Sequence, residues 1–297
     1  MKRLYADLGL LIVALIWGST FPVVKIALNS MSPFAFNAIR FFIACLFFLP
    51  FVKREGFKDG FKIGLAVFLG YSFQTVGLEF TTATNAGFIT SLYVVLAPLL
   101  AYMIYGISLN RIDIVGILLA FIGVYLLSGY SGFSLGDLLI LACAFAFGLE
   151  IAMISYYSKL VNPTMLAFWQ IFAVAILSTP FAIFTTVNFE INYDVVVALI
   201  ITAFFATFVA KMLQNWLQRY TKPSDAAVIM SMEGVFSHIF AVAMLGECLN
   251  FLQYFGAALI VMAVIVVSLN SRTAEANINT ARLIDSHAYN RNPREYR

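Results

Sequence analysis

Charged residues are scarce in this sequence of 297 residues. Only 11% of the residues are Asp, Glu, Lys or Arg, whereas 62% are hydrophobic. Soluble domains carry about 25% charged residues, and the mean hydropathy of +0.92 excludes an ordinary soluble domain. The composition predicts an all-α polytopic membrane protein. The formal net charge of +3 does not indicate a nucleic-acid partner, because the placement of the basic residues has another explanation.

Cysteines and catalytic groupings are also few. Cys45, Cys143 and Cys248 are odd in number, and two of them lie in apolar segments, so they offer neither a disulfide framework nor a metal site. Intramembrane hydrolases need paired groups such as Ser and His, two Asp, or His-Glu-x-x-His. No such pairing occurs, and the sequence has no Walker loop. We therefore expect no enzyme activity, no cofactor and no ATP-driven pumping.

Apolar segments long enough to cross a membrane fill most of the chain. A crossing helix takes about 20 residues, and we predict ten spans, at 6–28, 34–52, 62–79, 85–105, 112–128, 136–157, 164–185, 194–217, 224–245 and 251–269. The first apolar run follows basic residues, as in a signal peptide, but it is too long and lacks a small-x-small cleavage site. We expect it to remain as the first helix. The polar stretch 271–297 is expected to be a disordered cytoplasmic tail.

Lysine and arginine residues indicate the orientation. If the N-terminus lies inside, the inner gaps and the two chain ends hold nearly all of them, and the outer gaps hold none. Only Lys25, Arg40 and Lys211 fall within spans. This asymmetry follows the positive-inside rule. We predict a multi-pass protein of the cytoplasmic (inner) membrane with both termini in the cytoplasm.

The two halves of the sequence resemble each other. At an offset of 130 positions, Asp7, Leu11, Ala14, Gly18 and Pro33 match Asp137, Leu141, Ala144, Gly148 and Pro163. Beyond the gap near 186–193 the offset becomes 140, so Ala86, Ile89, Ser91 and Val95 match Ala226, Ile229, Ser231 and Val235. Each half, 1–130 and 131–270, has five spans, and this odd number inverts the second half. Inverted repeats give many secondary transporters alternating access; duplication without transport is the alternative.

The first span contains helix-disturbing and polar residues. Ser19, Thr20 and Pro22 lie inside it, and such sequence is tolerated at membrane depth where it is buried in protein or lines a cavity. Pro22, and Pro98 in the fourth span, each remove an intrahelical hydrogen bond. We predict a hinge at each of these two prolines.

Ionisable residues inside spans are functional candidates. Glu150, Lys211 and Glu233 lie at about the same depth, which predicts an ion pair between Lys211 and one of the glutamates. It is either a packing pair, kept because two buried charges need each other, or a gate or substrate contact. Arg40 lies deep enough for a structural or cavity contact, whereas Lys25 is close enough to the outer surface to snorkel.

Further candidates carry aromatic, amide or imidazole groups. Trp17, Tyr71, Gln74, Tyr93 and Trp169 lie within spans and are candidate substrate contacts, since small-molecule pockets combine apolar walls with a few placed polar groups. The alternative is interhelical hydrogen bonding and, for tryptophan, anchoring at the membrane interface. His238 is a candidate for proton coupling, with a hydrogen-bonded packing role as the alternative.

Several short motifs recur in a characteristic order. They are Trp17-Gly-Ser with Pro22 and Lys25, Ser32-Pro33 followed by Arg40-Phe-Phe, Ala83-Thr-Asn-Ala86, Ser224-Asp-Ala-Ala227, Met232-Glu233 and Leu245-Gly-Glu247. Together they resemble the EamA-type carriers of the drug/metabolite transporter superfamily over residues 6–269. The sequence departs from that family at Gly234, where proline is usual, and at Ile107, which replaces the glutamate of the Gly-Glu pair in the first half.

The resemblance implies a carrier that exports or exchanges small metabolites, with amino acids or related zwitterions as the expected substrates. It also implies a central cavity between the halves, with the fifth and tenth spans at the periphery. Proton-coupled efflux of cationic or aromatic drugs is the alternative, and a non-transporting receptor or scaffold is the alternative of another class. The expected partners are a small-molecule substrate and the lipid bilayer, with protons as a candidate coupling ion. The chain is expected to be a monomer or homodimer.

Overall fold

The computed structural model describes residues 2–96, 100, 111–127, 133–185, 189–221 and 223–266. Its helices are α1 (Lys2–Ala27), α2 (Pro33–Phe48), η1 (Leu49–Phe51), α3 (Phe57–Phe80), α4 (Ala83–Thr90), α6 (Arg111–Leu127), α7 (Leu135–Tyr157), α8 (Pro163–Thr185), α9 (Tyr193–Leu199), the π-helix η2 (Ile200–Val209), α10 (Ala210–Leu217), α11 (Pro223–Met230) and α12 (Glu233–Leu245). A last apolar helix runs from Phe251 to Val266. The predicted all-α class is confirmed for these residues.

Seven of the helical segments are long and apolar enough to cross a membrane, and three shorter apolar helices run over Ala83–Leu96, Ile114–Leu127 and Phe251–Val266. The shorter helices coincide with parts of the predicted spans 85–105, 112–128 and 251–269. The count of ten therefore stays a prediction. Pro98 and the predicted tail 271–297 lie outside the described residues.

Local sequence chemistry sets several of the helix boundaries. Thr82 caps α4 by accepting a hydrogen bond from the Asn85 backbone at 3.0 Å. Ser134 and Asp137 form a reciprocal capping box at the start of α7, which satisfies two backbone donors at once. Gly246 ends α12 with a φ of 66°, a left-handed conformation that favours glycine.

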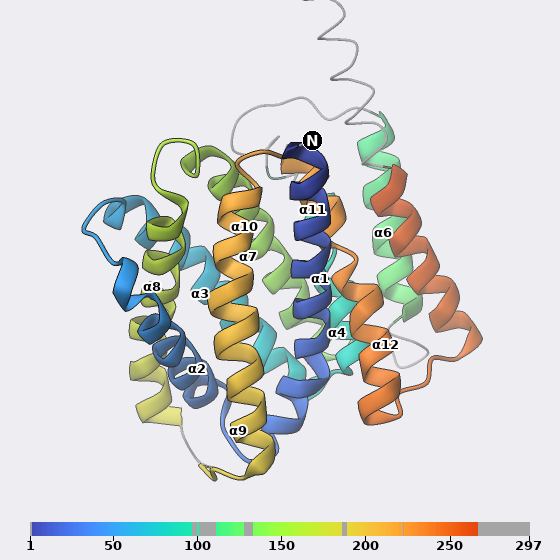
Figure 1. Ribbon diagram of the computed structural model, residues 1–297. Helices are drawn as coiled ribbons and strands as arrows, with labels where there is room; N and C mark the ends of the chain where they lie inside the picture. Colours follow the sequence, from blue (N-terminus) through green and yellow to red (C-terminus); the bar gives the residue numbers. More distant parts are fainter. Residues whose placement is uncertain are drawn as a thin grey trace, which may run out of the picture.

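The helices form one bundle in which segments from the two halves of the sequence alternate (Figure 1). α3 packs between α7 and α8, α2 packs against α8, and α1 packs against α12. α9, η2 and α10 follow one another as a single rod beside α1 and α2 (Figure 1). α6 and the 251–266 helix lie at the edge of the bundle, where a Cβ atom on Gly123 or Gly256 would collide with the other helix's backbone. This placement agrees with the peripheral position expected for the fifth and tenth spans.

Polarity is distributed as expected for a protein in lipid. The charged side chains of Arg40, Asp137, Glu150, Lys211 and Glu233 are buried within the bundle. Large hydrophobic side chains, by contrast, are exposed along the outer surfaces of most helices. Buried charges in such a setting are costly and mark functional positions, so the bundle interior is the expected place for a site.

Two helices at the centre are interrupted in the same way. The chain turns at 91–92, after α4, and at 231–232, between α11 and α12. Four backbone hydrogen bonds at the first turn have counterparts at an offset of 140, among them Leu92 N to Ile89 O, which matches Met232 N to Ile229 O. A fifth, from Val95 N to Leu92 O, has no counterpart among the described residues of the second turn. The Ser91 hydroxyl also donates to the Ser231 carbonyl at 2.9 Å. The two interruptions therefore touch each other.

The two ends of the bundle differ in charge. We call the end that holds the segments 50–56, 158–162 and 218–221 the basic face, and the end that holds 28–32, 81–82, 189–192 and 246–250 the distal face. The described segments of the basic face contain Lys53, Arg54, Lys159 and Arg219, whereas those of the distal face contain no Lys or Arg. The membrane orientation inferred from this pattern stays a prediction.

Candidate functional site

A small cavity lies among α1, α3, α7, α10, α12 and the stretch that follows α4. Its described lining residues are Trp17, Thr20, Phe21, Tyr71, Gln74, Tyr93, Phe147, Glu150, Ile151, Lys211, Gln214 and Glu233. The free space at its centre is about 20 Å³, which is room for about one water molecule. An occupant larger than that requires the lining side chains or the helices that carry them to move.

The lining residues correspond in pairs at the two offsets of the sequence repeat. Every lining residue has its counterpart in the lining. At an offset of 130 the pairs are Trp17 with Phe147, Thr20 with Glu150 and Phe21 with Ile151. At an offset of 140 they are Tyr71 with Lys211, Gln74 with Gln214 and Tyr93 with Glu233. The two halves of the chain thus contribute equivalent positions to one cavity. Their chemistry differs, because the acids and the lysine all come from the second half.

A buried ion pair occupies one side of the cavity. Lys211 Nζ lies 2.6 Å from Glu150 Oε1, and each side chain is only 2% exposed. The same ammonium group lies 4.8 Å from the ring centroid of Trp17, 5.6 Å from that of Tyr71 and 5.5 Å from that of Phe147. The lysine is therefore held by one carboxylate and by the faces of three aromatic rings, each of which attracts a cation.

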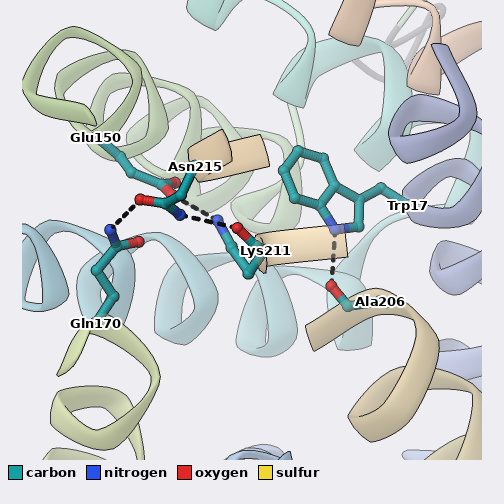
Figure 2. A network of polar contacts seen from close by, with 6 residues as sticks. All are labelled: Trp17, Glu150, Gln170, Ala206, Lys211 and Asn215. Atoms are coloured by element: carbon teal, nitrogen blue, oxygen red, sulfur yellow. Dashed lines mark hydrogen bonds and ion pairs between the residues drawn. The ribbon is translucent and has the colours of Figure 1, made fainter. Parts of the chain in front are cut away.

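Neighbouring polar groups fix the helix that carries the lysine (Figure 2). Asn215 Nδ2 donates to the Lys211 carbonyl at 2.9 Å, and Gln170 Nε2 donates to Asn215 Oδ1 at 3.0 Å. On the other side, Trp17 Nε1 donates at 2.9 Å to the carbonyl of Ala206, which belongs to the π-helix η2 just before Lys211. π-helical turns are frequent at functional sites.

Three buried polar atoms of the cavity accept or donate no hydrogen bond within the described part of the chain. They are Tyr93 Oη, Gln214 Oε1 and Glu233 Oε1. Buried polar atoms are normally paired, and a water molecule or a polar ligand in the cavity would pair these three. Tyr93 and Glu233 also lie close enough to interact with each other. Since Gln214 Oε1 is an acceptor, the cavity suits a ligand that carries hydrogen-bond donors.

Eight of the predicted site residues line the cavity, and five of the described ones do not. One of these five is Pro22, which lies inside α1, and its hinge role stays a prediction. Ser19 Oγ donates to the Ile16 carbonyl within its own helix. Arg40 lies behind the cavity wall, where its Nε donates to Thr207 Oγ1 at 2.8 Å and its guanidinium stacks on Tyr71. Trp169 Nε1 donates to the Glu55 carbonyl at the basic face, as an anchoring residue does. The remaining residue, His238, lies within hydrogen-bond distance of Thr84 Oγ1 and Tyr254 Oη near the distal face.

The expected ion pair of Lys211 forms with Glu150, while the snorkelling of Lys25 to the membrane surface stays a prediction. Lys25 Nζ donates to the carbonyls of Leu78, at 2.8 Å, and Thr81. These carbonyls lie at the C-terminal end of α3, where unsatisfied acceptors attract a cation. The side chain is therefore used to tie α1 to α3.

Sequence reasoning missed Phe21, Phe147, Ile151 and Gln214 as lining residues. Two of them were available from the repeat, since Phe147 corresponds to Trp17 at an offset of 130 and Gln214 to Gln74 at 140, whereas Ile151 corresponds to Phe21, which was not a candidate. Applying the offset to each candidate would have found Phe147 and Gln214. No such signal singled out Phe21, an apolar residue among many.

At the distal face, residues of the second half of the chain form hydrogen bonds with the turn between α3 and α4. Asp137 Oδ1 accepts from Thr81 Oγ1 at 2.6 Å. The Glu247 carboxylate accepts from the backbone amides of Ala83 and Thr84 at 2.8 and 2.9 Å. Together these contacts close the distal end of the central helices.

The equivalent contact is missing at the basic face. Asp7 and Thr221 correspond to Asp137 and Thr81 at the two repeat offsets. Thr221 Oγ1 donates instead to the Leu217 carbonyl of its own helix, and Asp7 Oδ1 is buried with no hydrogen-bond partner in the described chain. The two ends of the bundle are therefore closed differently although they carry the same pair of side chains.

Comparison with known proteins decides the class. The profile of the EamA-like transporter family matches the chain twice, over residues 4–129 and 134–269. The chain belongs to the EamA-like transporter family. It is 72% identical over 269 residues to an uncharacterized transporter of Archaeoglobus fulgidus, covering 91% of this chain and 87% of that protein.

More distant relatives carry similar names. The chain is 24% identical over 307 residues to the uncharacterized transporter YetK of Bacillus subtilis, covering 93% of this chain and 90% of YetK. A crystal structure described only as that of a protein superimposes with a TM-score of 0.68 at 20% identity, over 91% of this chain and 99% of the other. This last similarity shows a shared fold alone.

Family membership confirms the resemblance drawn from the sequence motifs. An EamA-like transporter is a multi-pass membrane protein that binds a small-molecule substrate within the lipid bilayer. Membership favours transport over catalysis and over a receptor or scaffold role. The substrate and the mechanism of this EamA-like chain have to be argued from its cavity.

Proposed function

We propose that this chain is a secondary transporter of small zwitterionic metabolites, amino acids or related compounds, in the cytoplasmic membrane. The substrate binds in the cavity between two inverted repeats, 1–130 and 131–270, and reaches either face by alternating access. The observation that carries the proposal is the composition of the cavity. A site lined by equivalent positions of two halves, and containing buried charges of both signs, lies where secondary transporters bind their substrates.

Three further features support the inverted repeat. The family profile matches each half separately. The helix interruptions at 91–92 and 231–232 have four backbone hydrogen bonds at equivalent positions. The packing of α3 against α7 has its counterpart in the packing of α10 against α1, because the two pairs correspond at the repeat offsets.

The substrate class follows from the charges and rings in the cavity. A zwitterion needs a carboxylate for its ammonium group and a cation for its own carboxylate, and Glu150, Glu233 and Lys211 provide both. Trp17, Phe21 and Phe147 add an apolar wall for a side chain. We infer that export or exchange of amino acids fits this combination.

The unequal closure of the two faces supports alternating access. In an inverted repeat, the contact between Asp137 and Thr81 and that between Asp7 and Thr221 are equivalent closures of opposite ends. Only the distal contact is formed here. We infer that the basic-face contact forms when the distal one opens.

Counterflow in proteoliposomes tests the function. Purified protein is reconstituted, loaded with unlabelled amino acids, and supplied with a labelled amino-acid mixture, with and without an inward-acid pH gradient. We expect uptake that is lost in Glu150→Gln and kept in Lys159→Gln, which removes a charge from the basic face. Absence of flux for amino acids, nucleobases and cationic dyes in folded protein would refute transport of these classes.

Proton-coupled efflux of cationic or aromatic drugs is the second candidate. The observation that favours it is the excess of one carboxylate over the lysine among three aromatic rings. In the same proteoliposomes, ethidium movement that requires the pH gradient, together with indifference to amino acids, would select this candidate. Amino-acid counterflow that ignores the gradient would select facilitated exchange.

A further inference from the structure

The ammonium group of Lys211 already lies in a box that is suited to an ammonium ligand. Three rings, of Trp17, Tyr71 and Phe147, have their centroids 4.8 to 5.6 Å from Nζ, and Glu150 Oε1 lies 2.6 Å from it. Aromatic rings around a cation are a general means of recognising ammonium ligands. The protein thus fills this box with a cation from its own chain.

The hydrogen bonds that fix residue 211 from Asn215 and Gln170 act on its backbone, and its ammonium group is held, among the described residues, by Glu150 and the three rings. Asn215 binds the carbonyl of Lys211, and Gln170 holds Asn215 (Figure 2). The side chain itself is a flexible four-carbon stem. Glu233 lines the same cavity, where its carboxyl group interacts with the Tyr93 hydroxyl and with the charge of Lys211. It is therefore a second carboxyl group within the reach of the ammonium group.

We propose that Lys211 is a tethered substitute for the ammonium group of the substrate. In the empty transporter it fills the aromatic box and pairs with Glu150. A substrate ammonium takes this place, and the displaced lysine moves towards Glu233, where it also meets a carboxylate of the substrate. The ligand class is a small primary amine, alone or as part of a zwitterion. This inference rests on the proposed function for its transport step only.

When the ammonium groups of Lys211 and the substrate replace each other in this way, Glu150 is paired with a cation whether or not substrate is bound. A buried carboxylate that loses its partner is strongly destabilising. An empty transporter with an unpaired Glu150 would therefore be slow to switch between the forms open to the two sides of the membrane. With Lys211 in the box, the empty form can return. The lysine therefore permits net flux, whereas a transporter without it is restricted to exchange.

Binding of methylammonium tests the box without any transport. Trp17 fluorescence reports it in a Trp169→Phe/Trp216→Phe background, in which Trp17 is the one remaining tryptophan. We expect Lys211→Met to bind methylammonium at least about tenfold more tightly, because the internal competitor is gone. Glu150→Gln should bind at least about tenfold more weakly, and Lys211→Arg, which keeps a cation, should stay near the parent. Lys62→Met removes an exposed lysine and should change nothing.

Unchanged or weaker binding in Lys211→Met overturns the proposal, since a lysine that only stabilises the cavity or binds substrate carboxylate gives that result. If Lys211→Met is not recovered folded, Lys211→Gln is measured with the same expectation. In proteoliposomes, the neutral variant should keep amino-acid counterflow while net efflux falls at least about tenfold. Parallel loss of both also overturns it. No flux in the parent refutes the proposed function, while methylammonium binding still decides the role of Lys211.

Discussion

The contact between Asp137 and Thr81 gives a prediction whose sign and size follow from the structure. Its 2.6 Å hydrogen bond to a carboxylate is of the charge-assisted kind, worth about 1.5–3 kcal/mol, against about 0.5–1.5 kcal/mol for a neutral one. Asp137→Asn keeps the shape but removes the charge and one of the two acceptor oxygens, so the side chain can no longer accept from both Thr81 Oγ1 and the Ser134 amide. We expect it to destabilise the form closed at the distal face by about 1 kcal/mol, and so to shift the equilibrium towards distal opening about fivefold.

Labelling of a cavity cysteine measures this shift. Thr20→Cys places a thiol in the cavity of a variant whose native cysteines are replaced, and an impermeant maleimide is added from the distal side. The parent Cys248, which is exposed in the 246–250 segment, identifies that side beforehand. Asp137→Asn should raise the labelling rate about fivefold, and Thr81→Val should act in the same direction.

Asp7→Asn is the matched control, because Asp7 occupies the equivalent position and its Oδ1 is unpaired among the described residues. It weakens only the form closed at the basic face, so it should lower the distal labelling rate. If both substitutions change the rate in one direction, or if folded Asp137→Asn leaves it unchanged, the two contacts are not alternating closures.

Three other substitutions probe the frame around the cavity. Arg40→Lys removes the Nε hydrogen bond to Thr207 and the stacking on Tyr71. We expect the free energy of unfolding to fall by about 1.5–3 kcal/mol, which is measured as a lower Tm in detergent. An unchanged Tm would contradict the structural role of Arg40. Gly123→Leu forces a side chain into the backbone of the 251–266 helix and should cost about 1–3 kcal/mol, whereas Leu118→Ala, at an exposed position of α6, should leave Tm nearly constant. Glu247→Gln weakens the cap on α4, so amide hydrogen exchange there should accelerate about fivefold for each lost kcal/mol; equal exchange would show that the cap adds nothing.

The arrangement of the fold was largely predictable because membrane helices follow simple rules. Apolar length placed the spans, and the Lys and Arg pattern separated the two faces that the structure also separates. The coincidence of Glu150, Lys211 and Glu233 in one cavity followed from counting their depth along each helix. These signals are properties of single segments, and the sequence displays them directly.

The sequence could not predict which of several possible partners a charged side chain binds. Lys211 had two glutamates within reach, and only the positions of α7 and α12 around α10 decide that Glu150 binds it. Lys25 could reach either the membrane surface or the end of α3, and the structure shows its ammonium group bonded to the carbonyls of Leu78 and Thr81. The π-helix η2 had no signal either, because its residues are as apolar as those of an ordinary span.

The contact of Ser91 with Ser231 has a mechanical consequence. It joins the two halves at the interruptions of their central helices, so each helix acts as a lever pivoted at that point. The start of α4 lies eight residues from Ser91, an arm of about 12 Å. A rotation of about 10° then moves Thr82 by about 2 Å while the pivot stays still, given the helical rise of about 1.5 Å per residue. Such a movement separates the donor and acceptor at the distal face, although the hydrogen bond at the pivot remains intact.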